Sequence, residues 1–173
     1  MKQILVVVVL VTFFVVIAVN RDAAQEDDKS AVEATVRQFE RACQDFDFDQ
    51  ADSILLPDAR WIEYSLPAKL GDIEWPRLRA LKSAGVRISF RVHDFEINVR
   101  GDVAWVTLTL DGTFTSDGED GRKLLNPTPG RCVSQGTHVS CNQTFVESEV
   151  LVRTTAGWKI ALGHTSSPPK AEN

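Results

Sequence analysis

Apolar residues recur at helical spacing from residue 30 onward. The sequence Ser30-Ala-Val-Glu33 has the pattern of a capping box, in which a hydroxyl and a carboxylate satisfy free backbone amides at a helix start. Apolar side chains then follow three or four residues apart, as the buried face of a helix requires. They are Val32, Val36, Phe39, Cys43 and Phe46. We therefore predict a first helix from Ser30 to about Asp47.

The next part of the chain predicts two shorter helices with a strand between them. The second helix begins near Asp49 and ends at Pro57, which has no backbone N–H to donate. A short strand follows over residues 60–64. The third helix covers residues 74–84 and stops at Gly85. Its inward-facing side chains are expected to be Trp75, Leu78 and Leu81.

Alternation of apolar and polar residues then indicates long strands. Over residues 86–99 the alternation changes phase at residues 93–94, where a β-bulge would re-aim both faces of the strand. A tight turn at residues 101–102 leads into another strand over residues 103–115.

The remainder of the chain predicts an insertion and a final hairpin. Residues 116–142 are rich in Gly, Pro and Ser, and we expect them to form a loop. The hairpin follows over residues 144–167. Because the helices precede the strands, the predicted fold class is α+β, with helices packed on one face of a curved antiparallel sheet.

The turn of the final hairpin determines which side chains share a face of the sheet. A three-residue turn, 155–157, would pair Trp158 with Thr154 and His164 with Ser148. The polar face would then carry Glu147, Glu149, Leu151, Arg153, Lys159, Ala161, Gly163 and Thr165. The apolar face would carry Val146, Val150, Val152, Trp158, Ile160, Leu162 and His164. A two-residue turn would mix the two sets, so we expect the three-residue turn.

The N-terminal segment predicts export. Lys2 precedes an apolar run over residues 4–19, a length typical of a signal peptide and short for a membrane span. Small residues in Val16-Ile17-Ala18 favour cleavage after Ala18, so residues 1–18 are the expected signal peptide. The alternative is an uncleaved signal anchor extending to about residue 24, which would be the protein's link to a membrane. We expect residues 19–29 to be a disordered leader and residues 168–173 a tail.

Export affects how the cysteines are interpreted. Outside the cytoplasm, Cys132 and Cys141 are expected to form a disulfide. Cys43 lies on the apolar face of the first helix and is expected to be a core residue. The cysteine and histidine spacing does not match a zinc site, so neither a metal nor a cofactor is predicted. The formal net charge of −5 argues against nucleic acid as a partner.

Several motifs along residues 30–167 resemble the SnoaL-like branch of the nuclear transport factor 2 superfamily. They are the turn ending in Ala51-Asp52, the strand opening Gly101-Asp-Val-Ala-Trp105 and the ending Gly157-Trp158…His164-x-Ser166. The same motifs are similar to the association domain of calcium/calmodulin-dependent protein kinase. The resemblance implies a cone-shaped half-barrel with the N-terminal helices on its concave face, a pocket between sheet and helices, and a homodimer formed through the outer face of the sheet.

The resemblance also indicates which residues are candidates for chemistry. In the kinase association domain, pocket arginines stand at positions matching Glu149 and Thr165, which implies that the polar hairpin face lines the pocket. Ketosteroid isomerases and polyketide cyclases of the superfamily use an acidic residue as a general base, so we predict Glu149 for this role. Tyr64 is the predicted hydrogen-bond donor, and His164 is a further catalytic candidate. Alternatively, the glutamates form an exposed charge ladder and His164 is structural.

The predicted pocket combines aromatic walls with these polar residues. Its members are Trp61, Tyr64, Trp75, Trp105, Glu147, Glu149, Arg153 and Thr165. The first hypothesis is an exported homodimer that binds a small, mostly apolar molecule in the cone. The second is an isomerase, cyclase or dehydratase that needs no cofactor and uses a pocket carboxylate. The third is a homo-oligomeric assembly module with a vestigial pocket.

Overall fold

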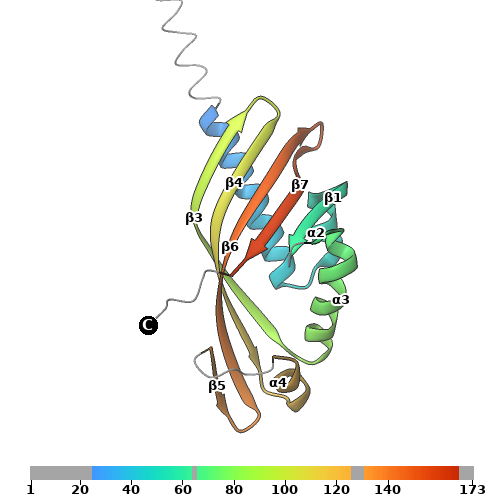
Figure 1. Cartoon of the computed structure of the whole chain (residues 1–173), viewed down its shortest axis with the longest axis vertical. Helices are drawn as coiled ribbons and strands as arrows, with labels where there is room; N and C mark the ends of the chain where they lie inside the picture. Colours follow the sequence, from blue (N-terminus) through green and yellow to red (C-terminus); the bar gives the residue numbers. More distant parts are fainter. Residues whose placement is uncertain (1–24, 64–65, 126–130, 168–173) are drawn as a thin grey trace, which may run out of the picture.

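Helices cover one face of a single curved sheet in the computed structural model, which describes residues 25–63, 66–125 and 131–167 (Figure 1). The helices are the first helix (residues 25–44), α2 (Phe48–Ile54), α3 (Leu70–Ser83) and α4 (Glu119–Leu125). The strands are β1 (Leu55–Glu63), β2 (Leu66–Ala68), β3 (Arg87–Arg100), β4 (Val103–Ser116), β5 (Cys132–Gln135), β6 (His138–Thr154) and β7 (Gly157–Ser166).

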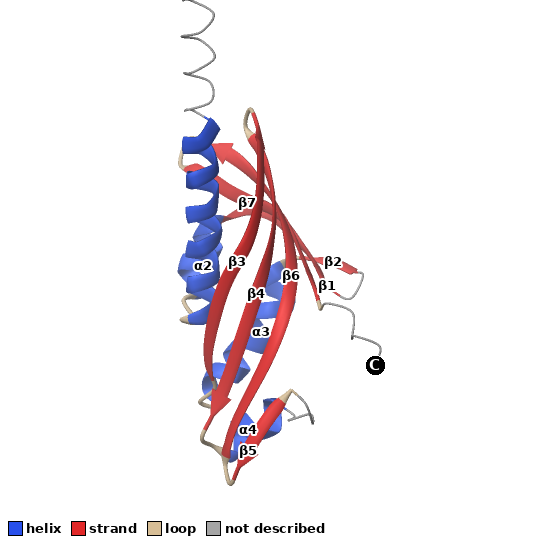
Figure 2. Cartoon of the chain, turned by 90° about the vertical axis from the view of Figure 1, so that its left-hand side faces the viewer, coloured by secondary structure: helices blue, strands red, loops and turns tan. Residues whose placement is uncertain are grey.

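The strand order is β2-β1-β7-β6-β4-β3, with β5 added to β6. The sheet is curved and open, and the helices lie on one side of it (Figure 2). The predicted α+β class is therefore confirmed. The sheet is mixed rather than wholly antiparallel, because β1 runs parallel to β7.

The helical segments have the predicted buried faces but different ends. The first helix is already formed at residue 25, so Ser30 is not its start, and residues 25–29 of the predicted disordered leader are helical. Its stripe is buried as expected, from Val32 to Cys43. Asp47 caps α2 by accepting a hydrogen bond from the Gln50 amide. Helix α3 begins before the predicted residue 74, and Pro57 lies in β1 rather than at a helix end.

Strands β3 and β4 confirm the predicted bulge and turn. The register shifts between His93 and Glu96, and Asp94 takes a positive φ of 55° there. The turn into β4 contains Gly101 at φ 60°, a left-handed conformation that costs glycine little.

The predicted loop at 116–142 is the main error of element assignment. Strand β4 extends to Ser116 and β6 starts at His138, and the ladder between them continues to the pair Ser116 and Val139. Helix α4 and strand β5 occupy the described part of the remaining segment, next to the far ends of β4 and β6 (Figure 1). Cys132 and Cys141 form the predicted disulfide across β5 and β6, with their Cα atoms 4.0 Å apart.

The final hairpin combines a two-residue turn with a bulge. Thr154 pairs with Gly157 and Arg153 with Trp158, so the expected three-residue turn is wrong. The register then shifts near Ala161, and Ser148 pairs with His164 as predicted. Because the bulge inverts the alternation, Trp158 and Ile160 face the core instead of the outer face.

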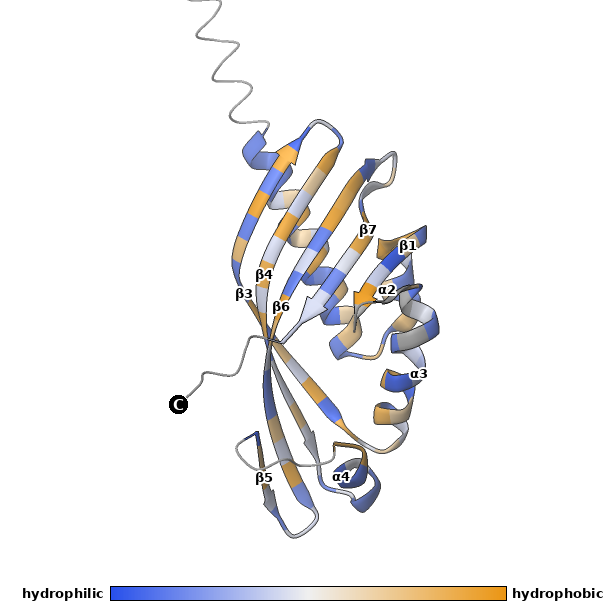
Figure 3. Ribbon diagram, in the orientation of Figure 1, coloured by the Kyte–Doolittle hydropathy of each residue, from blue (hydrophilic) through white to orange (hydrophobic). Residues whose placement is uncertain are grey.

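The main core fills the space between the helices and the concave face of the sheet. Apolar and polar residues alternate along the long strands (Figure 3). The buried set includes Phe39 of the first helix, Leu78 of α3, Leu108 of β4, Leu151 of β6 and Ile160 of β7. The predicted signal peptide and the tail lie outside the described residues. None of the described helices is long and apolar enough to cross a membrane.

Candidate functional site

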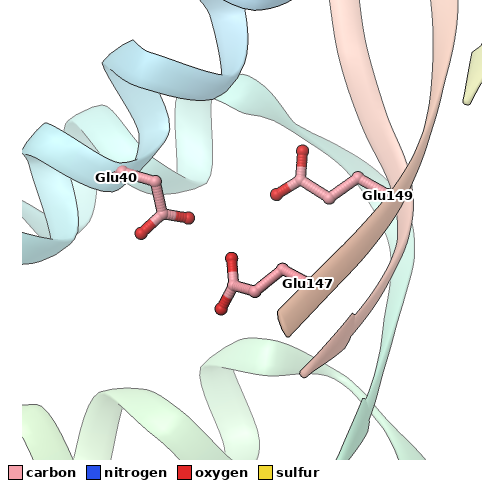
Figure 4. Close-up of side chains that lie close together, drawn as sticks. All are labelled: Glu40, Glu147 and Glu149. Carbon is pink, nitrogen blue, oxygen red and sulfur yellow. The ribbon is translucent and has the colours of Figure 1, made fainter. Parts of the chain in front are cut away.

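Three glutamates meet on the concave side of the sheet (Figure 4). Glu40 comes from the first helix, and Glu147 and Glu149 come from β6. Their relative exposures are only 4%, 5% and 2%, respectively. One carboxylate oxygen from each residue lies within 4.8 Å of the others. We call these three residues the acidic cluster.

The side-chain periodicity of the strand and of the helix directs these three side chains toward the core. Glu147 and Glu149 are two apart on β6, so both project from the same face of the sheet. Glu40 follows Val36 by four residues, which places it on the buried stripe of the first helix. The two strand glutamates were predicted from sequence as pocket residues, and Glu40 was not. The available signal was its helical spacing from Val36.

A short hydrogen-bond chain fixes Glu147. The Trp61 indole N–H donates to the Thr165 hydroxyl at 2.9 Å, and that hydroxyl donates to Glu147 Oε1 at 3.0 Å. The Glu147 and Glu40 carboxyl groups also share a hydrogen bond. Trp61 is held close to the backbone of β7, because a Cβ at Gly163 would lie 2.1 Å from its ring. A glycine at 163 therefore allows the tryptophan to reach Thr165.

Glu149 differs from its neighbours in its contacts. Neither of its carboxylate oxygens has a hydrogen-bond partner among the described residues. A buried carboxylate without donors is costly in its charged form. Burial, and then the negative charge of Glu147, raise the pKa of Glu149 well above 4.5.

The surroundings of Glu40 also favour its protonated form. Burial raises its pKa well above 4.5, and the charges of Glu147 and Glu149 raise it further. Its hydrogen bond with Glu147 acts in the same direction. Neighbouring carboxylates cannot all ionise easily in a desolvated site, so the acidic cluster favours keeping protons.

The acidic cluster adjoins a small inner cavity of about 80 Å³. Glu40, Glu147 and Thr165 line it, whereas Glu149 lies beside it. Its aromatic walls are Phe39, Trp61, Trp75, Phe90, Phe114 and Phe145. The Trp75 indole N–H donates to Asp52 at 2.8 Å, which fixes that wall.

A larger outer cleft of about 640 Å³ adjoins the inner cavity. The two share Arg77, Phe114, Phe145 and Thr165. The cleft is lined by residues of α3 and α4, by the disulfide and by the ends of β6 and β7. Its volume is in the range of small-molecule sites, while the inner cavity alone is below that range.

The structure separates the predicted site residues into two groups. Trp61, Trp75, Glu147 and Thr165 line the inner cavity, and Glu149 lies beside it. Trp105, Arg153 and His164 do not line this cavity. Tyr64 lies outside the described residues.

Trp105 and Arg153 are corrections to the predicted pocket, whereas His164 lies outside the inner cavity. Trp105 lies on the outer face of the sheet, because it alternates with the buried Ala104 and Val106. Arg153 is at the end of β6, where its guanidinium pairs with Asp28 at 2.5 Å. His164 is exposed and lines the outer cleft only.

The acidic cluster has the chemistry for proton transfer. A protonated carboxyl and a neighbouring carboxylate can serve as acid and base within one cavity. The same oxygens are also ligands that a divalent cation accepts, but calcium takes six to eight oxygens. The aromatic residues around the cavity contribute no oxygen ligands.

Comparison with known proteins agrees with this geometry at the level of the fold. The family profile described as the SnoaL-like domain matches residues 32–170. No curated protein matches the chain. A candidate dehydratase of the NTF2-like family from Streptomyces avermitilis has a similar structure, with TM-score 0.60 and 21% identity over 83% of this chain and 98% of that one.

Two further solved structures are similar at low identity. A candidate ketosteroid isomerase from Shewanella frigidimarina has TM-score 0.56 and 18% identity, over 79% of this chain and 94% of that one. The association domain of calcium/calmodulin-dependent protein kinase II from C. elegans has TM-score 0.59 and 12% identity, over 83% of this chain and 98% of that one. At these identities the likeness concerns the fold.

Proposed function

The chain belongs to the SnoaL-like family, and from this premise we propose that it is a cofactor-independent enzyme that moves protons within a small, mostly apolar molecule. Isomerases, cyclases and dehydratases are the reaction classes that fit. The observation that carries the proposal is the hydrogen-bonded pair of Glu40 and Glu147, buried and facing one cavity. The similar folds of a candidate dehydratase and a candidate isomerase support it.

In the proposed mechanism, Glu147 is the base and Glu40 the acid. The Glu147 carboxylate takes a proton from carbon next to a substrate carbonyl, while the Glu40 carboxyl gives its proton to the carbonyl oxygen. This produces an enol, and the reverse transfers return a proton to the α carbon or, in a dienol formed from an unsaturated ketone, to the γ carbon. Thr165 orients Glu147 by its hydrogen bond of 3.0 Å. Glu149 was predicted from sequence as the base, but we propose Glu147 for this role because Glu149 does not line the cavity.

The two adjoining cavities suggest how such a substrate would lie. The inner cavity has room for the reacting end of a molecule, next to Glu40 and Glu147. The apolar remainder would extend past Phe114 and Phe145 into the outer cleft. The outer cleft favours ligand binding over the third hypothesis from sequence, an assembly module with a vestigial pocket.

Deuterium exchange into ketones tests the proposed chemistry without knowledge of the natural substrate. The probe is 4-phenylbutan-2-one in deuterium oxide, followed by proton NMR. We expect the wild-type protein to accelerate exchange at the carbon next to the carbonyl. Glu147→Gln should lower that rate by about 100-fold or more, as the loss of a general base does. Glu40→Gln should lower it less, because solvent can replace the acid.

A matched variant controls for the loss of one negative charge. Glu119 of α4 lies on the surface in ion pairs with Arg122 and Lys123, away from the inner cavity. Glu119→Gln should keep the wild-type rate. Equal exchange rates for wild type and Glu147→Gln would contradict the proposed base.

We also propose that the mature protein is an exported homodimer. The disulfide supports an oxidising compartment. Exposed apolar residues on the outer face of the sheet support self-association. They are Val103, Trp105, Val146 and Leu162, with exposures between 37% and 42%.

A further inference from the structure

We infer that the natural ligand of the inner cavity carries a protonated primary or secondary amine, which the acidic cluster recognises. The inference rests on the proposed function only in taking the inner cavity as the substrate site. It adds the charge and the hydrogen-bonding class of the ligand.

The first support is the charge around the site. The described groups that act on Glu40 and Glu149 are other carboxylates, and no described cation offsets them. Arg77 lies at the junction of the two cavities, where it is half-exposed and paired with Glu74. With Glu147 ionised and no described cation beside it, the potential at the cavity floor is negative, so a cationic ligand would be attracted and an anionic one repelled.

The second support is the unsatisfied side chain of Glu149. It is 2% exposed, points toward the other two carboxylates, and accepts no hydrogen bond through either oxygen (Figure 4). Buried hydrogen-bond acceptors in proteins are usually paired with a donor, so a ligand that donates to Glu149 would satisfy its carboxyl group. A protonated amine supplies two or three N–H donors and the opposite charge together, which makes strong charge-assisted hydrogen bonds.

The third support is the aromatic lining. Phe90, Phe114, Phe145 and the two tryptophans surround the approach to the acidic cluster. Aromatic faces attract ammonium groups, and the attraction is larger where water is excluded. The same walls accept the apolar remainder of an organic amine.

Four phenyl compounds of similar size test the inference through binding alone. They are 2-phenylethylamine, its trimethylammonium analogue, 2-phenylethanol and 3-phenylpropanoate. The amine is charged at pH 7, like lysine. Isothermal titration calorimetry with the wild-type protein should show the amine binding about tenfold or more tightly than the alcohol. The carboxylate should not bind. The trimethylammonium compound should bind more weakly than the amine, because it has no N–H group.

Substitutions in the acidic cluster then test which carboxyl groups recognise the amine. Glu149→Gln should weaken amine binding about tenfold and leave alcohol binding unchanged. Glu40→Gln provides a second variant at the same site and should act in the same direction. Glu119→Gln, which removes an equal charge from the surface of α4, should match the wild type for both compounds.

Several results would overturn the inference. One is equal affinity of the amine and the alcohol, and another is absence of amine binding. Displacement of the amine by micromolar calcium or magnesium would identify the cluster as a metal site instead. The outcome is separable from that of the ketone exchange: a protein that selects the amine but exchanges no ketone keeps this inference and loses the proposed function. A protein that exchanges ketones but does not prefer the amine keeps the proposed function and loses this inference.

Discussion

At the scale of single residues, the unusual feature is the burial of three acids in one place. Natural proteins seldom bury a carboxylate unless it is paired or functional. Glu147 is oriented by Thr165, whereas Glu149 has no donor among the described residues. An unpartnered buried acid lowers stability, and its retention is more easily explained by function than by folding.

Glu149→Gln should therefore stabilise the protein at neutral pH. Because the folded pKa of Glu149 is above 4.5, the folded protein retains a proton that the unfolded chain has released. Stability consequently falls as pH rises above 4.5 toward the folded pKa, and is not penalised below 4.5. The substitution should raise the free energy of unfolding by about 1–2 kcal/mol at pH 7 and reduce its slope with pH. Urea unfolding between pH 4 and pH 8 measures both; an unchanged slope would contradict the raised pKa.

At the scale of elements, alternation alone located most of the site but not all of it. The phase of β6 correctly placed Glu147 and Glu149 on one face, because no bulge separates them. The same reasoning failed for Trp158, since the bulge near Ala161 has no sequence signal as clear as the phase change at His93. Glu40 was not predicted, because a single acidic residue beside an apolar stripe has the same local pattern whether it is buried or exposed.

The segment formed by α4, β5 and the adjoining ends of β4 and β6, which we call the arm, was not predicted because of its composition. Gly, Pro and Ser between residues 116 and 142 indicated a loop, although pairing across the long β4–β6 ladder determines the structure there. Such non-local pairing leaves little trace in a local pattern. The disulfide was predictable, because its two cysteines are close in sequence and the N-terminal segment indicated export.

Removing the disulfide should affect this arm more than the site. The double substitution of Cys132 and Cys141 by serine should lower the free energy of unfolding by about 2–3 kcal/mol, through the entropy of the released loop. Hydrogen exchange should show the amides of β5 losing protection, while those of β4 near Leu108 remain protected. Equal loss of protection in both strands would mean that the disulfide supports the whole sheet.

At the scale of the whole molecule, the two faces of the sheet differ in the residues that they present. The concave face holds the acidic cluster and the core, and the outer face exposes an apolar patch around Trp105. The folds of the kinase association domains show that this architecture occurs in assembling proteins. The patch is the surface through which we expect two copies to pair.

Trp105→Lys should convert the expected dimer to a monomer. A charge at the centre of an apolar interface must be desolvated on association, which is costly. Val133→Lys is the matched control, because Val133 is 74% exposed on β5, which pairs with the start of β6, whereas Trp105 pairs with Val150 near the other end of that strand. Sedimentation velocity should report a monomer for the first variant and a dimer for the second. A wild-type monomer, or two dimeric variants, would contradict the assignment of this face.

The central claim is that a proton-holding acidic cluster forms the floor of the cavity, and titration of its carboxyl groups tests it most directly. Carbon-13 NMR of the glutamate side chains would follow each group, with Gln variants providing the assignments. We expect Glu40 and Glu149 to titrate well above 4.5. Glu147→Gln should lower both midpoints, because the charge of Glu147 contributes to each shift. Midpoints near 4.5 for both residues in the wild-type protein would show that the cluster is hydrated and ionised, and would contradict the claim.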